Sequence, residues 1–166
     1  MIVLGIDPGS QKTGWGVVEV VRRDLVARGW GVVRMPSTQP FYERLLKIHE
    51  ELCKVIEHHH PDEAAAEGIF ASGSVQNYQS ALKLGQARGA ALVALARAGL
   101  PLSEYPPAEV KKSLVGHGRA EKWQIQGMVQ SVLKLDEKPA EDAADALAVA
   151  ICHSFRVQLP QLRGLR

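Results

Sequence analysis

This sequence has few cysteines, no long apolar run and a small net charge, and each of these features narrows the classes of protein to which it can belong. The two cysteines, Cys53 and Cys152, are too few for a disulfide framework and lack the spacing of metal ligands, so a reducing cytoplasm is the expected compartment. The longest apolar stretch, Ala90–Ala98, is interrupted by an arginine and is too short to cross a bilayer, so no membrane association is expected. A net charge of +2 does not by itself indicate a nucleic-acid-binding protein.

The chain does have the length and composition of one soluble domain. It has 166 residues, and 46% hydrophobic with 23% charged residues is ordinary for a globular protein with a real core. The first apolar run follows Met1 without a basic segment or cleavage site, so no signal peptide is expected. We expect a single domain over residues 1–156 and a basic, flexible tail over residues 157–166.

The hydrophobic patterning predicts an α/β fold. Strands are predicted at 2–6, 15–21, 25–35, 63–67 and 102–105, and helices at 41–58, 80–98, 109–115, 120–133 and 139–155. Residues 63–67 have the composition of a helix, yet we predict a strand because an α/β chain needs its next strand between two strong helices. The order indicates an antiparallel meander followed by right-handed crossovers, with helices flanking the sheet.

Two acidic side chains stand at the ends of predicted strands. Asp7 ends the first strand, where Pro8 and Gly9 force a turn, and Glu67 ends the fourth strand next to Gly68. The carboxyl ends of parallel strands meet at one edge of a sheet, and binding sites form there. Both acids are therefore expected at the same edge.

Two more acids begin the last predicted helix. Asp142 and Asp145 are three residues apart and share one face, and the alanines around them let the helix press close to the sheet. Asp142 is also a candidate helix cap, so this pair alone does not decide between a structural and a functional role. With Asp7 and Glu67, however, four acids converge without matched cations. Such oxygen ligands suit Mg²⁺ or Mn²⁺ and the two-metal hydrolysis of a phosphodiester.

A narrow face of small residues runs along the helix predicted at 80–98. It consists of Leu82, Gly85, Gly89, Leu92 and Ala96. Two interpretations remain open. The face packs on the sheet, or it forms a symmetric contact between two copies in a homodimer.

Several motifs, in order along the chain, carry a resemblance to one family. They are Gly5-Ile-Asp-Pro-Gly-Ser10, Thr13-Gly-Trp-Gly16, Ala66-Glu67 with Phe70, Ser80-Ala-Leu-Lys-Leu-Gly-Gln-Ala-Arg-Gly89, Val110-Lys-Lys with Val115-Gly116, Ala120-Glu-Lys122, and Asp142-Ala-Ala-Asp-Ala-Leu-Ala148. From residue 2 to about residue 155 the sequence resembles the RuvC crossover junction endodeoxyribonucleases. The resemblance implies a ribonuclease-H-like fold, with a five-stranded mixed sheet flanked by helices.

The resemblance also implies an activity and its partners. It implies a homodimer that resolves Holliday junctions, the four-way DNA junctions of homologous recombination and DNA repair, by paired symmetric nicks. Two-metal hydrolysis would leave 5′-phosphate and 3′-hydroxyl ends. The implied partner is the RuvA–RuvB branch-migration complex, in the cytoplasm.

The same resemblance assigns roles to individual residues. The catalytic, metal-binding acids are Asp7, Glu67, Asp142 and Asp145, which would hold two Mg²⁺ ions, with Mn²⁺ as a substitute. Lys111 and Lys122 match lysines near the scissile backbone, and Phe70 matches an aromatic that stacks on bases at the junction centre. Lys112 and Arg119 are weaker candidates for phosphate contact.

One segment departs from the family pattern. The loop over residues 71–79 is longer than usual and contains no lysine. Because this loop lies where the family reads DNA, the resemblance does not extend to the cleavage-sequence preference.

Three other functions compete with this one. An ATP-dependent phosphotransferase of the actin and sugar-kinase class also begins with a strand, an acid and a hairpin, but it needs two such domains. A non-catalytic junction-binding relative would normally lose one of the acids, and all four are present. Another ribonuclease-H-like nuclease, acting on different DNA or on RNA, remains open.

Overall fold

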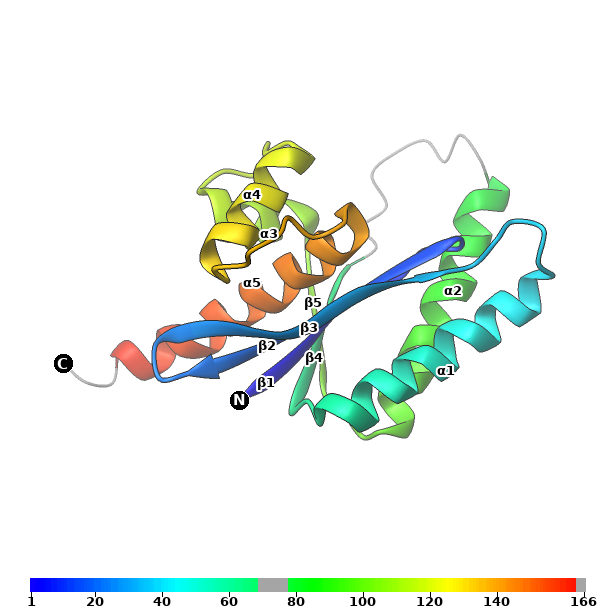
Figure 1. The fold of residues 1–166 in the computed structure, drawn as a ribbon, viewed down its shortest axis with the longest axis horizontal. Helices are drawn as coiled ribbons and strands as arrows, with labels where there is room; N and C mark the ends of the chain where they lie inside the picture. The colour runs from blue at the N-terminus through cyan, green and yellow to red at the C-terminus, as the bar shows by residue number, and fades with distance from the viewer. Residues whose placement is uncertain (69–77, 164–166) are drawn as a thin grey trace.

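A five-stranded mixed sheet with helices on both faces forms the protein (Figure 1). The computed structural model describes the backbone of residues 1–68 and 78–163 and the side chains up to residue 157. The strands are β1 (Ile2–Asp7), β2 (Lys12–Val21), β3 (Asp24–Arg34), β4 (Glu63–Glu67) and β5 (Leu102–Tyr105). The helices are α1 (Phe41–His59), α2 (Tyr78–Arg97), α3 (Pro107–Val115), α4 (Lys122–Val132) and α5 (Glu141–Arg163).

The first strand lies at the centre of the sheet, whose order is β3-β2-β1-β4-β5. β1, β2 and β3 form an antiparallel meander, whereas β4 runs parallel to β1 and β5 runs parallel to β4. Ile6 pairs with Ala66, so Asp7 and Glu67, the next residue of each strand, end neighbouring strands at the same level. The predicted convergence of two strand ends is therefore present.

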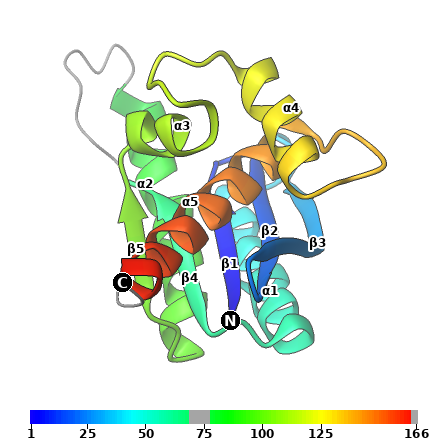
Figure 2. The ribbon, with the colours of Figure 1, turned by 90° about the vertical axis from the view of Figure 1, so that its left-hand side faces the viewer.

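Each face of the sheet has its own hydrophobic core. α1 and α2 pack together on one face, over a cluster that includes Leu4 and Ile6 of β1. α5 crosses the other face, with α3 and α4 packed against it (Figures 1 and 2). Side chains alternate along a strand, so Asp7, an odd-numbered residue like Val3 and Gly5, points to the α5 face.

α5 lies directly on glycines of the two central strands. A Cβ atom on Gly5 would come within 2.0 Å of the Ala146 carbonyl oxygen, and one on Gly14 within 1.8 Å of the Asp142 carbonyl oxygen. Real Cβ atoms never approach so closely, so only glycine permits this spacing. Gly14 is the register partner of Asp7. The glycines therefore bring the first turn of α5 directly to the end of β1.

A buried histidine ties the far half of α5 to the sheet. His153, on α5, hydrogen bonds through Nε2 to the Glu63 carboxylate at 2.8 Å and through Nδ1 to the Tyr105 hydroxyl at 2.7 Å. The residue is 2% exposed. Tyr105 is the register partner of Glu67, and its carbonyl accepts a hydrogen bond from the Gly68 N–H at 2.8 Å. This network fixes the angle of α5 across β4 and β5.

All five predicted strands are present, including Glu63–Glu67, the segment with helical composition. The prediction was wrong at the C-terminal end. α5 continues through Arg163, so residues 157–163, predicted as part of a flexible tail, have a helical backbone. The helix had been predicted to end at about residue 155.

The small face of α2 is exposed at both of its ends. The buried side of this helix is instead formed by Ala87, Arg88, Ala91, Ala94 and Leu95. Leu82 is 56% exposed, and no atom lies within 4 Å of the position of a Cβ on Gly85 or Gly89. The packing interpretation is therefore wrong for this part of the face, whereas Leu92 is partly buried against the core.

Candidate active site

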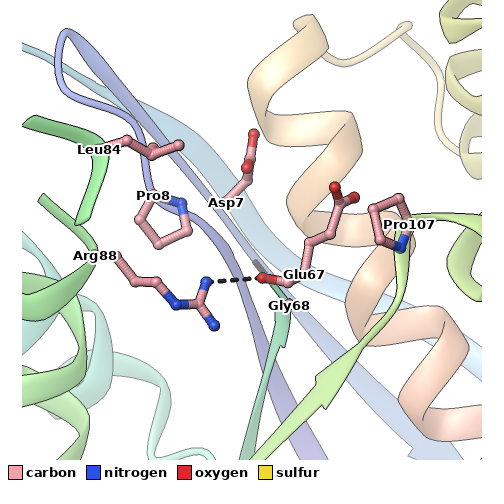
Figure 3. A pocket seen from close by; sticks show the side chains of 7 residues that line it. All are labelled: Asp7, Pro8, Glu67, Gly68, Leu84, Arg88 and Pro107. Carbon is pink, nitrogen blue, oxygen red and sulfur yellow. Dashed lines mark hydrogen bonds between the residues drawn. The ribbon is translucent and has the colours of Figure 1, made fainter. Parts of the chain in front are cut away.

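Asp7 and Glu67 lie together in a hollow at the carboxyl edge of the sheet. The hollow has a volume of about 230 Å³ and is lined by Asp7, Pro8, Glu67, Gly68, Leu84, Arg88 and Pro107. Figure 3 shows both carboxylates at this edge, with α5 behind them. The turn after Asp7 is held by Arg44, whose Nη1 donates to the Ser10 carbonyl oxygen at 3.0 Å. The carboxylate of Asp7 is thus fixed at an open edge.

Three other acids lie close enough to Asp7 to raise its pKa. Its pKa is raised from 3.8 to about 7, first by burial and then by repulsion from Asp145, Glu67 and Asp142. Lys122 opposes this shift. Near neutral pH and without a bound cation, the carboxyl of Asp7 is therefore protonated far more often than an ordinary aspartate.

Glu67 and Asp145 share this environment. Burial is the main cause that raises the pKa of each, and the charge of Asp145 raises that of Glu67 further. Asp142 lies in the first turn of α5 after Glu141, so it is not the N-cap residue of the helix. The structure thus brings together all four acids that the sequence singled out, from β1, β4 and α5.

The donor set fits a hard divalent cation. It consists of carboxylate oxygens, it is partly buried, and it carries more negative charge than the neighbouring cations neutralise. Across the described residues, however, no three His, Cys, Asp or Glu side chains form a preassembled metal site. Mutual repulsion holds carboxylates apart, and a cation would let their side chains turn inward.

Two of the predicted lysines act electrostatically on the acids. Lys111 lowers the pKa of Glu67 and of Asp145, and Lys122 does so for Asp7 as well. Lys122 also forms an ion pair with Glu141, and that hydrogen bond is the main cause that raises its own pKa. Both lysines reach the acids from α3 and α4.

The other two predicted basic residues do not affect the pKa values of the acids in the way that Lys111 and Lys122 do. Lys112 and Arg119 are exposed, and in the described part of the chain neither forms an ion pair with an acid. Phe70 and the loop over residues 71–77 lie outside the described residues.

Arg88 is a site residue that the sequence reasoning missed. Arg88 is 8% exposed, and its Nη1 donates to the Glu67 carbonyl oxygen at 2.7 Å (Figure 3). Its Nη2 pairs with Glu104. Arg88 thereby holds the end of β4 in place, and its charge lowers the pKa of Glu67. The signal was available, since Arg88 falls on the alanine face formed by Ala87, Ala91 and Ala94, where an unpaired charge would be costly.

This fold, with acids gathered at the end of its central strand, belongs to the class of ribonuclease-H-like nucleases. The particular family follows from comparison with known proteins. Residues 3–153 match the model of the family described as crossover junction endodeoxyribonuclease RuvC. The chain belongs to the RuvC family and is a crossover junction endodeoxyribonuclease, an enzyme of DNA recombination and repair that resolves Holliday junctions.

Curated relatives and solved structures agree with this assignment. The chain is 52% identical to the RuvC protein of Geobacter sulfurreducens, with all of both chains covered. It is 51% identical to that of Magnetococcus marinus, covering 91% of this chain and 82% of that one. The structure of Thermus thermophilus RuvC in complex with a Holliday junction substrate superposes with a TM-score of 0.87 at 37% identity, covering 96% of each chain. The yeast mitochondrial Holliday junction resolvase Ydc2, at 15% identity and a TM-score of 0.62, shares the fold.

Two predictions are confirmed at a coarser level. RuvC enzymes are metal-dependent nucleases, and the complex of the Thermus thermophilus protein shows binding of junction DNA in this family. Among the helices within residues 1–68 and 78–163, none combines the length and the hydropathy needed to span a bilayer.

Proposed function

We propose that Asp7, Glu67, Asp142 and Asp145 hold two Mg²⁺ ions, or Mn²⁺ in their place, and use them to hydrolyse one phosphodiester in each of two junction strands. The observation that carries this proposal is the convergence of four acids from β1, β4 and α5 at one edge of the sheet, where their charges together raise the pKa of Asp7. When bound, such ions activate a water molecule and stabilise charge on the leaving oxygen. The nicks would leave 5′-phosphate and 3′-hydroxyl ends.

The positions of the acids indicate different roles in metal binding. Asp7 lies between Glu67 on one side and the α5 acids on the other, so it is suited to be a ligand shared by both ions. Arg88 fixes the backbone at Glu67, and the glycine contact at Gly14 fixes Asp142. These supports hold the carboxylates in position before DNA arrives.

Basic residues outside the acid cluster hold the DNA. Lys111 and Lys122 neutralise the phosphate at the cut, and Lys112 and Arg119, which are exposed, contact backbone farther away. Phe70 follows the strand that ends at Glu67 by three residues, which suits stacking on a base at the junction centre.

The working enzyme is a homodimer whose two sites cut symmetrically. The open stripe of Leu82, Gly85 and Gly89 on α2 supports this assignment, since it leaves a helix face available to a second copy. A single nuclease domain over residues 1–156 fits the continuous sheet. The enzyme would act on chromosomal junctions in the cytoplasm, together with the RuvA–RuvB branch-migration complex.

One assay tests both the substrate and the metal. A labelled four-way junction, a linear duplex and an RNA–DNA hybrid are each incubated with Mg²⁺, Mn²⁺ or EDTA. We expect paired nicks in the junction alone, with either ion and not with EDTA, and products that DNA ligase reseals. Equal cleavage of the duplex or the hybrid, or cleavage in EDTA, would contradict the proposal.

A further inference from the structure

Beside the acid cluster lies a second hollow, which is basic. It has a volume of about 340 Å³, and its lining includes Lys12, Arg34, Lys47 and Ser37. We call it the basic hollow. Three of its lining residues are cationic, and none is acidic.

The sheet register places two of these cations side by side. Lys12, the first residue of β2, is paired with Arg34, the last residue of β3, so both side chains leave the same face of the sheet. Like charges directly opposite each other destabilise a strand pair. Lys47 adds a third cation from α1, and its Nζ donates to the Arg34 carbonyl oxygen at 3.0 Å. An anion between these groups would offset the repulsion.

One cation of the basic hollow forms an ion pair with an acid of the cluster. The Nζ atom of Lys12 lies 3.8 Å from the nearer carboxylate oxygen of Asp142. Within the described residues, Arg34 and Lys47 have no carboxylate partner. Lys12 therefore stands between one acid of the site and two unneutralised cations.

We propose that the basic hollow binds a phosphate of the DNA strand, neighbouring the phosphate that is cut. Lys12 pairs with Asp142 in the free protein, and it moves to this phosphate once Asp142 turns to its metal. Arg34 and Lys47 complete the phosphate contact. The inference rests on the proposed function, because it needs DNA at the acid cluster.

The ligand is a strand phosphate and not a free anion, for a structural reason. The cations are held around an open hollow by β2, β3 and α1, and Lys12 and Arg34 are both exposed. A backbone that passes the acid cluster can reach all three, whereas a small free anion would bind such exposed charges only weakly in salt.

The salt dependence of junction binding tests the phosphate contact. Binding is measured in EDTA at several salt concentrations, so that no strand is cut. Arg34→Ala should lower the slope of log K against log salt by about 0.9, the value expected for one phosphate contact. Lys54→Ala is the control, because Lys54 is an exposed lysine at the other end of α1, paired with Glu51; its slope should equal that of the wild type.

A chemically altered junction locates the phosphate. Single phosphates beside each cut site are replaced, one at a time, by uncharged methylphosphonates. At one position the substitution should weaken wild-type binding about tenfold and leave Arg34→Ala binding unchanged. A wild-type slope for Arg34→Ala, or equal losses in both proteins at every position, would overturn the inference. Inorganic phosphate that competes at millimolar concentration would also overturn it, by identifying a free-anion site.

These outcomes are separable from those of the proposed function. If the wild type nicks the junction but Arg34→Ala binds with an unchanged slope, only the basic hollow is refuted. If the wild type does not nick the junction with either ion, the proposed function itself fails.

Discussion

Asp7 has an unusual environment for a residue at the end of a strand. Its carboxyl is largely buried and lies among three other acids, so its pKa reaches about 7. An unfolded chain would release the same proton near pH 3.8. Between these values the folded, metal-free protein binds more protons than the unfolded chain. Its stability therefore falls as the pH rises through this window.

The first prediction concerns the stability of Asp7→Asn. An asparagine carries no charge at any pH, so the metal-free variant should match the wild type near pH 4 and become more stable than it as the pH rises to 8. Each kcal/mol gained should raise the melting temperature by about 2–4 °C. The measurement is thermal unfolding in EDTA across this range. Asp136→Asn is the control at an exposed acid. If the difference in melting temperature between the variant and the wild type does not change with pH, the pKa of Asp7 is not raised in the folded protein.

The same variant should lose its nuclease activity. With Mg²⁺, Asp7→Asn should nick a junction at least about a thousandfold more slowly, because the shared ligand is gone. The variant should still bind the junction, because the proposed role of Asp7 is to bind metal and not to contact DNA. A gel-shift assay and a nicking assay on one preparation check both expectations, and nicking at the wild-type rate would refute the metal assignment.

The roles of Arg88 and Lys12 were not predicted from the sequence. Asp7 and Glu67 were predictable because strand ends carry positional meaning in a parallel sheet. The alanine face marks Arg88 as a buried charge that needs a partner, but it does not reveal that this partner is the backbone carbonyl of Glu67. Lys12 likewise gains its importance from Asp142, which is remote in sequence and near in space.

At the scale of elements, the contact between α5 and the glycines of β1 and β2 determines how close the acids of α5 lie to Asp7. Gly14 is the position where this contact is tightest, and it is also the register partner of Asp7. A side chain there would push the first turn of α5 away from β1. The spacing between the acids is therefore a property of helix packing.

The second prediction concerns Gly14→Ala. The added methyl group would meet the Asp142 carbonyl oxygen, a backbone atom that cannot turn aside. We expect a loss of about 3 kcal/mol or more in the free energy of unfolding, together with a nicking rate reduced even where the protein remains folded. Urea unfolding with a parallel nicking assay measures both.

Gly127→Ala provides the matched control. Gly127 lies within α4 with open space around its Cβ position, so alanine should stabilise the protein by up to about 1 kcal/mol. Similar effects of the two substitutions would show that the α5 contact is not special.

Sequence patterns predicted the elements better than the faces that they bury. The strand Glu63–Glu67 was found because its place between two helices outweighed its composition, and burial of Ala64, Ala65 and Ala66 explains why tertiary packing prevailed. The face of α2 was not decided, because alanine stripes run on more than one side of that helix. The end of α5 was placed too early because the basic residues from Arg156 on were interpreted as a loose tail, whereas the helix continues through Arg163.

At the scale of the whole molecule, an apolar face of α2 is exposed. Leu82 and Val93 are 56% and 58% exposed on α2, with Gly85 and Gly89 open between them. Figure 1 shows α2 on the opposite side of the sheet from α5. A dimer formed through α2 therefore leaves the α5 face of each copy free.

The third prediction concerns this face. The double variant with Leu82→Glu and Val93→Glu should weaken the dimer about a hundredfold or more, because four unpaired carboxylates would be buried in the contact. Sedimentation should then report the monomer mass, and junction nicks should become single and uncoupled. Met128→Glu, at another exposed apolar position on α4, should leave the mass unchanged. A variant that keeps the dimer mass would show that the two copies meet elsewhere.

The order of the chain adds a final consequence for the acids that α5 carries. Glu67 is complete about 75 residues before Asp142, which at roughly 5–20 residues per second is about 4–15 s of synthesis. Until α5 has left the ribosome and settled on the glycines of β1 and β2, Asp7 and Glu67 lack their partners. Under the proposed function, a chain cut short before α5 lacks Asp142 and Asp145 and therefore cannot assemble the complete set of metal ligands.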